Sequence, residues 1–319
     1  MTQPNDDPQA RQPTVRKLKD EIEHAGDRAE VFNQYRGLLF SIAYRMLGSV
    51  ADAEDMLQET FIRWQRASEE EIRSTRAFLV TVVSRLCINH LQSMRVQREE
   101  YVGQWLPEPV VTQRNVDPFS LLRVDESLSM AFLVLLERLA PVERAVFLLR
   151  EVFDYDYSAI AQILAKDEAN CRKIFSRARQ HVAEIRPRFV TSPQQRERLL
   201  SEFLQATASG DMDGLVALLA DDAILYADGG GRGPALPNLV HGSVNIARAI
   251  LGSLNKLVPR NLTSRLLQVN GEPGVVSYLD RRPYSVVTFD VADGRINSIY
   301  VVTNPQKLEH LSDLPSTQF

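Results

Sequence analysis

Arginine, a side chain that binds both phosphates and guanine bases, is concentrated in two stretches of this sequence that have helical periodicity. The first stretch, residues 73–98, has no acidic residue and contains Arg73, Arg76, Arg85, Arg95 and Arg98. The second stretch, residues 167–188, reads DEANCRKIFSRARQHVAEIRPR. Two separate cationic helices predict a protein that holds a polyanion at two places.

A short acidic segment, DAEDMLQE at residues 52–59, precedes the first basic stretch. On helical spacing its carboxylates share the solvent side of one helix. Its polar residues are Asp52, Glu54, Asp55, Gln58 and Glu59. The segment is either an ordinary solvated helix face or a docking surface for a basic partner protein. An acidic pole beside a basic helix within one small domain favours the docking surface.

The apolar residues of the first half of the chain recur with helical spacing, which predicts compact helical bundles. One helix runs from Val31 to Gly48, a second carries the acidic segment, and a third spans about 75–97. After a Pro-rich linker, helices are expected at about 120–138, 141–151, 157–164 and 168–186. The last two helices and the tight turn AKDEAN form a helix-turn-helix, whose second helix would carry the basic residues into a DNA groove.

Beyond residue 195 the pattern changes from helices alone to helices followed by strands. A helix pair at 196–220 leads to a strand, the glycine loop DGGGRGP and a further helix. The strands are expected at 222–227, 262–269, 274–280, 284–291 and 295–302, with hairpin turns at 281–283 and 292–294. The predicted fold is therefore multidomain, with two all-α domains followed by an α+β domain.

The composition is that of an ordinary soluble protein, with 44% hydrophobic and 24% charged residues. A formal net charge of −4 excludes a wholly basic nucleic-acid coat protein but not a protein with local basic patches. The chain has no apolar run long enough to span a membrane, and its N-terminus lacks the apolar core of a signal peptide. Its two cysteines, Cys87 and Cys171, lie on apolar stripes, which predicts reduced, buried thiols and a cytoplasmic location.

The motifs of residues 30–190 resemble those of the extracytoplasmic-function sigma factors of bacterial RNA polymerase. YRGLLFSIAYRMLGSVADAEDMLQETFIRW, followed by RAFLVTVVSRLCINHLQSMRVQRE, is similar to their conserved region 2. LAPVERAVFLLREVFDYDYSAIAQILAKDEANCRKIFSRARQHV is similar to their region 4. The resemblance implies that the acidic segment binds the β′ clamp helices of core RNA polymerase, with the β subunit as a further partner, and that the chain directs the polymerase to promoters.

The same resemblance assigns the two basic helices to the two promoter elements. The residues expected at the −10 element are Arg76, Arg85, Asn89, Gln92, Arg95 and Arg98. The residues expected at the −35 element are Arg172, Lys173, Ser176, Arg177 and Arg179. Arg or Lys can bind guanine O6 and N7, which is worth roughly 1–3 kcal/mol per good pair. The sequence leaves open which of these side chains contact bases and which contact phosphates.

Residues 195–315 resemble the SnoaL-like cone domain that the SigJ-like group of these sigma factors carries. WLPEP (105–109), DGGGR (228–232) and NPQKL (304–308) resemble the signatures of that group, although Arg232 and Gln306 stand where the group has Lys and Asp. The resemblance implies that the extension contacts the linker and regulates the factor from within. The expected contact residues are Trp105, Leu106, Pro107, Asp228, Gly229, Gly230, Gly231, Arg232, Asn304, Pro305, Lys307 and Leu308.

The chain is therefore expected to divide into five segments. These are a disordered or short N-terminal segment (1–28), sigma region 2 (29–98), a linker (99–119), sigma region 4 (120–188) and the SnoaL-like domain (195–315).

Two other functions remain compatible with the sequence. The first is a cyclase or isomerase with a DNA-binding front half, for which Asp228, His241, Tyr226 and Tyr278 are the candidate bases and donors. The second is a helix-turn-helix repressor that senses a small ligand in the cone. Because no spacing joins the four candidates, and because zinc, Gly-x-Ser-x-Gly and phosphate-loop motifs are missing, we expect no enzyme activity, no metal and no cofactor.

Overall fold

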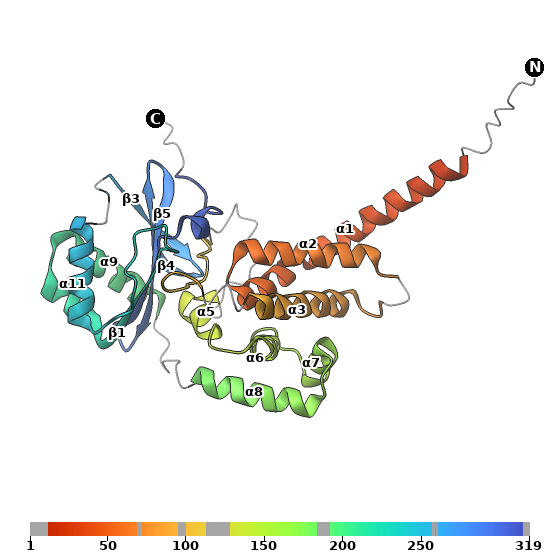
Figure 1. The fold of residues 1–319 in the computed structure, drawn as a ribbon, viewed down its shortest axis with the longest axis horizontal. Coiled ribbons are helices and arrows are strands. Elements are labelled where there is room, and N and C mark those ends of the chain that lie inside the picture. The colour runs from red at the N-terminus through yellow and green to blue at the C-terminus, as the bar shows by residue number, and fades with distance from the viewer. Residues whose placement is uncertain are drawn as a thin grey trace, which may run out of the picture.

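The computed structural model describes residues 12–68, 72–94, 100–112, 128–183, 192–256, 259 and 261–314, and Figure 1 shows their arrangement. Two helical bundles lie beside a C-terminal domain built from a sheet and helices. The predicted fold class, two all-α domains followed by an α+β domain, is confirmed. Among the described residues, every helix is too short or too polar to cross a membrane.

The first bundle contains α1 (Gln12–Leu47), α2 (Val50–Arg66) and α3 (Thr75–Ser93). The N-terminal part of α1 extends away from the rest of the molecule (Figure 1). Gly48, with a φ of +69°, ends α1 and separates it from α2. Ser49 then caps α2 by accepting a hydrogen bond from the backbone N–H of Asp52, as its capping sequence predicts.

The second bundle contains α5 (Met130–Leu136), α6 (Pro141–Phe147), a π-helical turn η5 (Leu148–Val152), α7 (Tyr157–Leu164) and α8 (Glu168–Ala183). Asp156 caps α7 at its start, and Ala165 ends it in the left-handed conformation. The buried stripe of α8 consists of Cys171, Ile174, Ala178 and Val182. The predicted helix-turn-helix is therefore present, and part of the expected helix at 120–138 lies outside the described residues.

One continuous apolar core joins the two helical bundles. It contains residues from α1, α2 and α3 and also from α5, α6, α7 and α8. Helix α3 lies against both α6 and α7. Because the bundles share a core, the surface of α3 that faces α7 is covered in this arrangement.

The C-terminal domain begins with α9 (Pro193–Ser209) and α10 (Met212–Leu218) and contains a six-stranded sheet. Its strands are β1 (Leu219–Asp228), β2 (Val240–His241), β3 (Thr263–Val269), β4 (Glu272–Leu279), β5 (Arg282–Ala292) and β6 (Arg295–Val302), in the order β2-β1-β6-β5-β4-β3. Helix α11 (Ser243–Lys256) packs with α9 and α10 against one face of the sheet, where residues such as Phe203, Phe289 and Ile299 form a second core.

The turn between β4 and β5 differs from the expected 281–283. The two turn residues are Asp280 and Arg281, both with positive φ, and Arg282 already pairs with Leu279 in the ladder. The turn was expected one residue too late because proline is common in turns. Proline is also tolerated in the first residues of a strand, where Pro283 lies. The turn expected at 292–294 is found at Asp293–Gly294, because Ala292 still pairs with Arg295 in the ladder.

The second face of the sheet packs against the helical part of the chain. A third apolar cluster joins Val276, Tyr278 and Tyr300 of this face to Leu106 of the linker and Met130 of α5. The short helix η6 (Pro305–Leu308) adds Leu308 to the same cluster. The C-terminal domain is therefore joined by an apolar contact to the linker and to the start of the second bundle.

Candidate nucleic-acid interface and the contacts that cover it

The expected −35 residues lie on the exposed side of α8. Arg172, Lys173, Ser176, Arg177 and Arg179 are all exposed, opposite the buried stripe that holds the helix in its bundle. Arg172 pairs with Glu168 and stacks over the ring of Tyr157 at 4.6 Å, and Arg177 lies 3.3 Å from Glu143. Exposed ion pairs of this kind are weak, so these guanidiniums can exchange their partners for phosphate.

The expected −10 residues on α3 are arranged differently, because Arg85 is bound to the second bundle. Its Nε donates to the backbone oxygen of Ile163 at 2.7 Å, and its Nη2 donates to that of Gln162 at 3.2 Å. Both oxygens belong to the last turn of α7, which carries the negative end of the helix dipole, and Gln162 O also accepts from Ala165 N–H at 3.4 Å. Arg85 therefore caps the first helix of the helix-turn-helix.

Other α3 residues of the expected −10 set have varied surroundings. Arg76 donates from Nε to the hydroxyl of Tyr155 at 3.1 Å and lies 5.3 Å from the centre of its ring. Asn89 and Gln92 are exposed. Arg95 and Arg98 lie outside the described residues.

A second arginine, on the second bundle, caps a helix of the first bundle. Arg144 of α6, with 3% of its surface exposed, donates to the backbone oxygen of Met46 at the end of α1 at 2.5 Å. It also pairs with Glu137 at 2.8 Å. Each bundle thus uses an arginine to cap a helix C-terminus of the other, and no sequence pattern predicts this reciprocal capping.

The acidic segment lies on α2, away from α7. Asp55 and Gln58 are exposed. The other members have partners inside the bundle: Glu54 pairs with Arg36 at 2.5 Å, Asp52 lies 3.5 Å from His90, and Glu59 pairs with Arg63 at 3.0 Å.

The linker is bound to the C-terminal domain through Asp228, which is fully buried at the end of β1. Its Oδ1 accepts a hydrogen bond from the hydroxyl of Tyr101 at 2.6 Å, and its Oδ2 accepts one from the backbone N–H of Leu106 at 2.8 Å. Lys307, 6% exposed, forms an ion pair with Oδ2 at 2.7 Å and donates to the backbone oxygen of Leu106. Burial first, and the Asp228 carboxylate second, raise the pKa of Tyr101 above its ordinary value. We call these four residues the linker clamp.

Aromatic rings complete the linker clamp. The ammonium of Lys307 lies 4.1 Å from the ring centre of Trp105 and 5.1 Å from that of Tyr101. Asn304 donates from Nδ2 to the Tyr101 hydroxyl at 2.8 Å. The ionic contact of the NPQKL motif thus runs through its lysine, and the departure at Gln306, which is exposed, leaves it in place.

The glycine loop fits closely against this clamp. Gly230 has a φ of +56°, and a Cβ there would lie 2.2 Å from Nδ2 of Asn304. A Cβ on Gly229 would lie 2.3 Å from the backbone oxygen of Gly233. Gly231 faces Val102, and Arg232 and Pro305 are exposed. The structure thus brings the three signature motifs together, with Arg232 and Pro305 at the surface.

The opposite side of the linker contacts the first bundle. The carboxylate of Glu108 accepts hydrogen bonds from Ser49 Oγ at 3.0 Å and from the backbone N–H of Val50 at 2.7 Å, at the start of α2. The backbone N–H of Glu108 donates to the oxygen of Gly48 at 2.8 Å. A Cβ on Gly48 would lie 2.7 Å from the Trp105 ring, and 3.4 Å from Pro107. The role of Glu108 was missed by sequence reasoning, because only the fold brings it to a helix start.

The four residues considered for catalysis do not form one site. Asp228 is engaged in the linker clamp, Tyr226 stacks on Tyr300 with ring centres 5.2 Å apart, and His241 is exposed on β2. Tyr278 is buried in the third apolar cluster.

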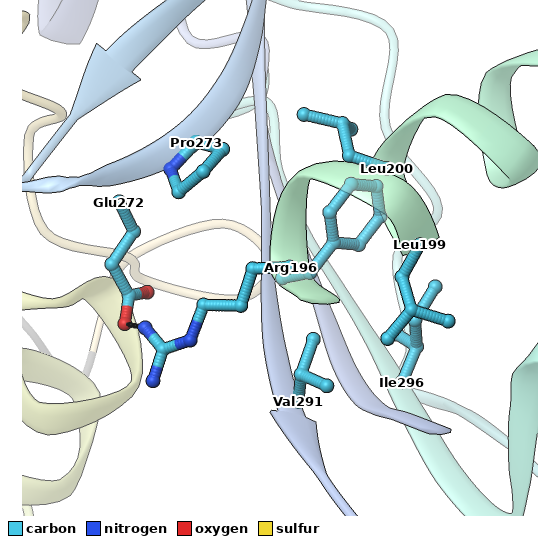
Figure 2. A pocket seen from close by; sticks show the side chains of 8 residues that line it. Arg196, Leu199, Leu200, Glu272, Pro273, Val291 and Ile296 are labelled. Atoms are coloured by element: carbon cyan, nitrogen blue, oxygen red, sulfur yellow. Dashed lines mark hydrogen bonds and ion pairs between the residues drawn. The ribbon is translucent and has the colours of Figure 1, made fainter. Parts of the chain in front are cut away.

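Between the sheet and α9 lies a pocket lined by residues such as Arg196, Glu272 and Phe289 (Figure 2). Its void measures about 10 Å³, which is room for one water molecule. Arg196 forms an ion pair with Glu272 at its edge.

Known proteins share these features. Residues 31–96 match the family model of Sigma-70 region 2, and residues 129–182 match that of Sigma-70 region 4. The chain is 36% identical over 289 residues to the ECF RNA polymerase sigma factor SigJ of Mycobacterium tuberculosis, a match that covers 86% of this chain and 91% of that protein. It is 30% identical to the probable ECF RNA polymerase sigma factor SigI of the same species, over 87% of this chain and 93% of that protein.

The crystal structure of Mycobacterium tuberculosis SigJ is similar in fold, with a TM-score of 0.73 and 34% identity. The similarity covers 88% of this chain and 98% of that chain, so it includes the C-terminal domain as well as the helical bundles. With its exposed basic helix-turn-helix, its acidic helix and the length of these matches, the chain belongs to the extracytoplasmic-function (ECF) family of RNA polymerase sigma factors and is a transcription initiation factor.

Proposed function

We propose that the exposed acidic side of α2 recruits core RNA polymerase, through the β′ clamp helices, in the cytoplasm. Asp55 and Gln58 face solvent on this helix, and the neighbouring Ile62 is 39% exposed, which gives the surface an apolar contact beside its charges. Negative charge beside an exposed apolar residue can first attract a basic partner protein and then contact it. The β subunit is the second polymerase partner that we propose.

For promoter DNA, we propose that α8 binds the −35 element and α3 the −10 element. Lys173, Ser176 and Arg177 are exposed along α8, in the helix that a helix-turn-helix places in the major groove. Opening the −10 element requires cationic and small polar side chains along a displaced strand, which Arg85, Asn89 and Gln92 of α3 provide.

We further propose that the C-terminal domain regulates the factor by holding it in a closed arrangement. The observation that carries this proposal is the contact of Arg85, an exposed residue whose guanidinium is bound to the last turn of α7. The arrangement binds Arg76 and Arg85 of α3 to the second bundle. Asn89 and Gln92 of α3 and the outer sides of α2 and α8 stay exposed. Polymerase and the −35 element can therefore be bound before the −10 surface is released.

The reach of the linker supports this proposal. The 21 residues of the linker (99–119) span on the order of 70 Å when fully extended. The two promoter elements lie about two helical turns, or about 70 Å, apart, so the two bundles need nearly the full length of the linker to reach both. The linker clamp and the contacts of Glu108 fix residues 101–108 against two domains. Full extension therefore requires that the clamp open.

The test is run-off transcription with purified core polymerase on a promoter library. We compare the full chain, a chain that ends near Arg188, and the Lys307→Ala variant, with Arg248→Ala on the distant helix α11 as the control. The chain that ends near Arg188 and the Lys307→Ala variant should each change promoter output by several-fold relative to the full chain. Arg248→Ala should not change it. Identical output from all four proteins would remove the case for regulation, and no promoter-specific output from any of them would remove the case for the polymerase and DNA surfaces.

A further inference from the structure

The tip of the β3–β4 hairpin is buried, although hairpin tips normally face solvent. Asn270 and Gly271 form the turn with φ values of +51° and +78°, as expected for an Asn-Gly sequence between two strands. Yet Asn270 is only 1% exposed. A buried amide must be hydrogen-bonded, so the partners of this side chain indicate why the tip is placed here.

The Asn270 amide bonds to three different parts of the chain. Its Oδ1 accepts from the backbone N–H of Val110 in the linker at 2.9 Å. Its Nδ2 donates to the hydroxyl of Tyr44 on α1 at 2.8 Å and to the backbone oxygen of Leu128, just before α5, at 3.1 Å. Because Val110 N–H can only donate and Leu128 O can only accept, these partners fix which way the amide points.

The contact continues from Asn270 to the start of the acidic helix. The Tyr44 hydroxyl donates to the backbone oxygen of Glu108 at 2.5 Å, and the Glu108 carboxylate caps α2. The linker also pairs with the hairpin through its backbone, since Asn270 N–H donates to Val110 O at 2.7 Å and Thr112 N–H donates to Gln268 O at 2.8 Å.

We propose that Asn270 is the positioning residue that couples the three parts of the closed arrangement, so that region 2, the linker and the start of region 4 are released together. This inference rests on the proposed regulation by the C-terminal domain, but it concerns a residue outside the three signature motifs. Aspartate and serine lack the two donors that the site needs. Glutamine has them, but its side chain is one methylene longer and it adopts the left-handed backbone less readily than asparagine.

The experiment measures amide hydrogen exchange in the full chain, with Asn270→Asp as the main variant. Aspartate has the same shape and tolerates the turn, but it places an oxygen against Leu128 O and lacks both donors. Asn270→Gly is the second variant, because glycine keeps the turn without adding charge. Asn245→Asp, on the exposed side of α11, makes the same chemical change away from the contact and is the matched control.

The informative amides are those that do not bond to the Asn270 side chain. Glu108 N–H, Thr112 N–H and Phe132 N–H report on the first bundle, the linker and α5 respectively. We expect all three to exchange at least tenfold faster in both Asn270 variants, and at the original rate in Asn245→Asp. Faster exchange at Val110 N–H alone would overturn the inference, because it would mean that Asn270 holds only its direct partner.

The transcription readout separates this inference from the proposed function. If the three amides are deprotected and promoter output stays at the level of the unaltered chain, the coupling by Asn270 stands and the proposed regulation fails. If the three amides are unchanged, the inference fails, whatever the truncated chain does in transcription.

Discussion

At the scale of single residues, the linker clamp depends on one buried ion pair. Asp228 is fully buried and Lys307 nearly so, and each has further hydrogen bonds to the linker. A buried pair of this kind adds little stability when compared with apolar residues, but removal of one partner is costly because the other charge stays buried. The pair therefore makes the contact specific: only the correct linker segment satisfies both groups.

Lys307→Ala should lower the free energy of unfolding of the chain by about 3 kcal/mol, because it leaves the Asp228 carboxylate buried without its cation. Denaturant unfolding monitored by tryptophan fluorescence is the measurement, since Trp105 stacks on Lys307. Lys173→Ala, at an exposed position, should change it by no more than about 0.5 kcal/mol. A loss below about 1 kcal/mol for Lys307→Ala would show that Asp228 is not confined as described.

The Tyr101 hydroxyl should make the clamp sensitive to alkaline pH. Its pKa is raised from the ordinary value of 10.0, so the folded chain keeps the phenol proton where the unfolded chain loses it. The stabilisation is fully present below pH 10 and is lost as the pH rises above it. Denaturant unfolding at pH 9 and pH 10.5 should therefore differ less in Tyr101→Phe than in the unaltered chain. An equal difference in both proteins would contradict the contact with Asp228.

At the scale of elements, α3 and α8 differ in what they offer to DNA. The basic side of α8 is exposed, whereas Arg85 of α3 caps α7. A cation at a helix C-terminus contributes typically 0.3–1 kcal/mol when exposed, so binding of polymerase or DNA can displace Arg85 readily.

Lys173→Ala should reduce the slope of log affinity against log salt for a −35 duplex by about one unit, because one phosphate contact is lost. Fluorescence anisotropy at several salt concentrations is the measurement. Arg85→Ala should leave this slope unchanged, since Arg85 belongs to α3 and caps α7, whereas the proposed −35 contacts lie on α8. A reduced slope for Arg85→Ala, or none for Lys173→Ala, would mean that the two helices do not act as assigned.

The elements themselves were largely predictable from the sequence, because local periodicity determines them. Cys171, Ile174, Ala178 and Val182 recur at helical spacing. This spacing correctly predicted α8 and the side of α8 that is exposed. The hairpin turn at Asp280–Arg281 was misplaced by one residue because Pro283 resembles a turn signal.

The contacts between elements were not predictable in the same way. Nothing near Arg85 in the sequence indicates that it caps a helix 77 residues away. The Asn-Gly pair at residues 270–271 predicts a turn. An exposed turn would have the same sequence, so the sequence does not indicate that Asn270 is buried. The signature motifs were identified by resemblance, and only the fold brought Glu108 and Tyr44 to the same place.

At the scale of the whole molecule, the C-terminal sheet has two different faces. One face is covered by its own helices α9, α10 and α11, and the other by the linker, α5 and η6. The second face of the sheet thus holds the linker and the start of the second bundle in place. The proposed opening would expose this face wherever the linker and α5 move away from it.

We propose that the free factor is closed and that core polymerase opens it. The most direct test is the distance between spin labels at Asn89→Cys on α3 and His181→Cys on α8, in a chain whose buried Cys87 and Cys171 are left in place. We expect a single short distance in the free protein, a longer one with core polymerase, and a longer one without polymerase in Lys307→Ala. An unchanged distance with polymerase bound and transcription active would contradict it.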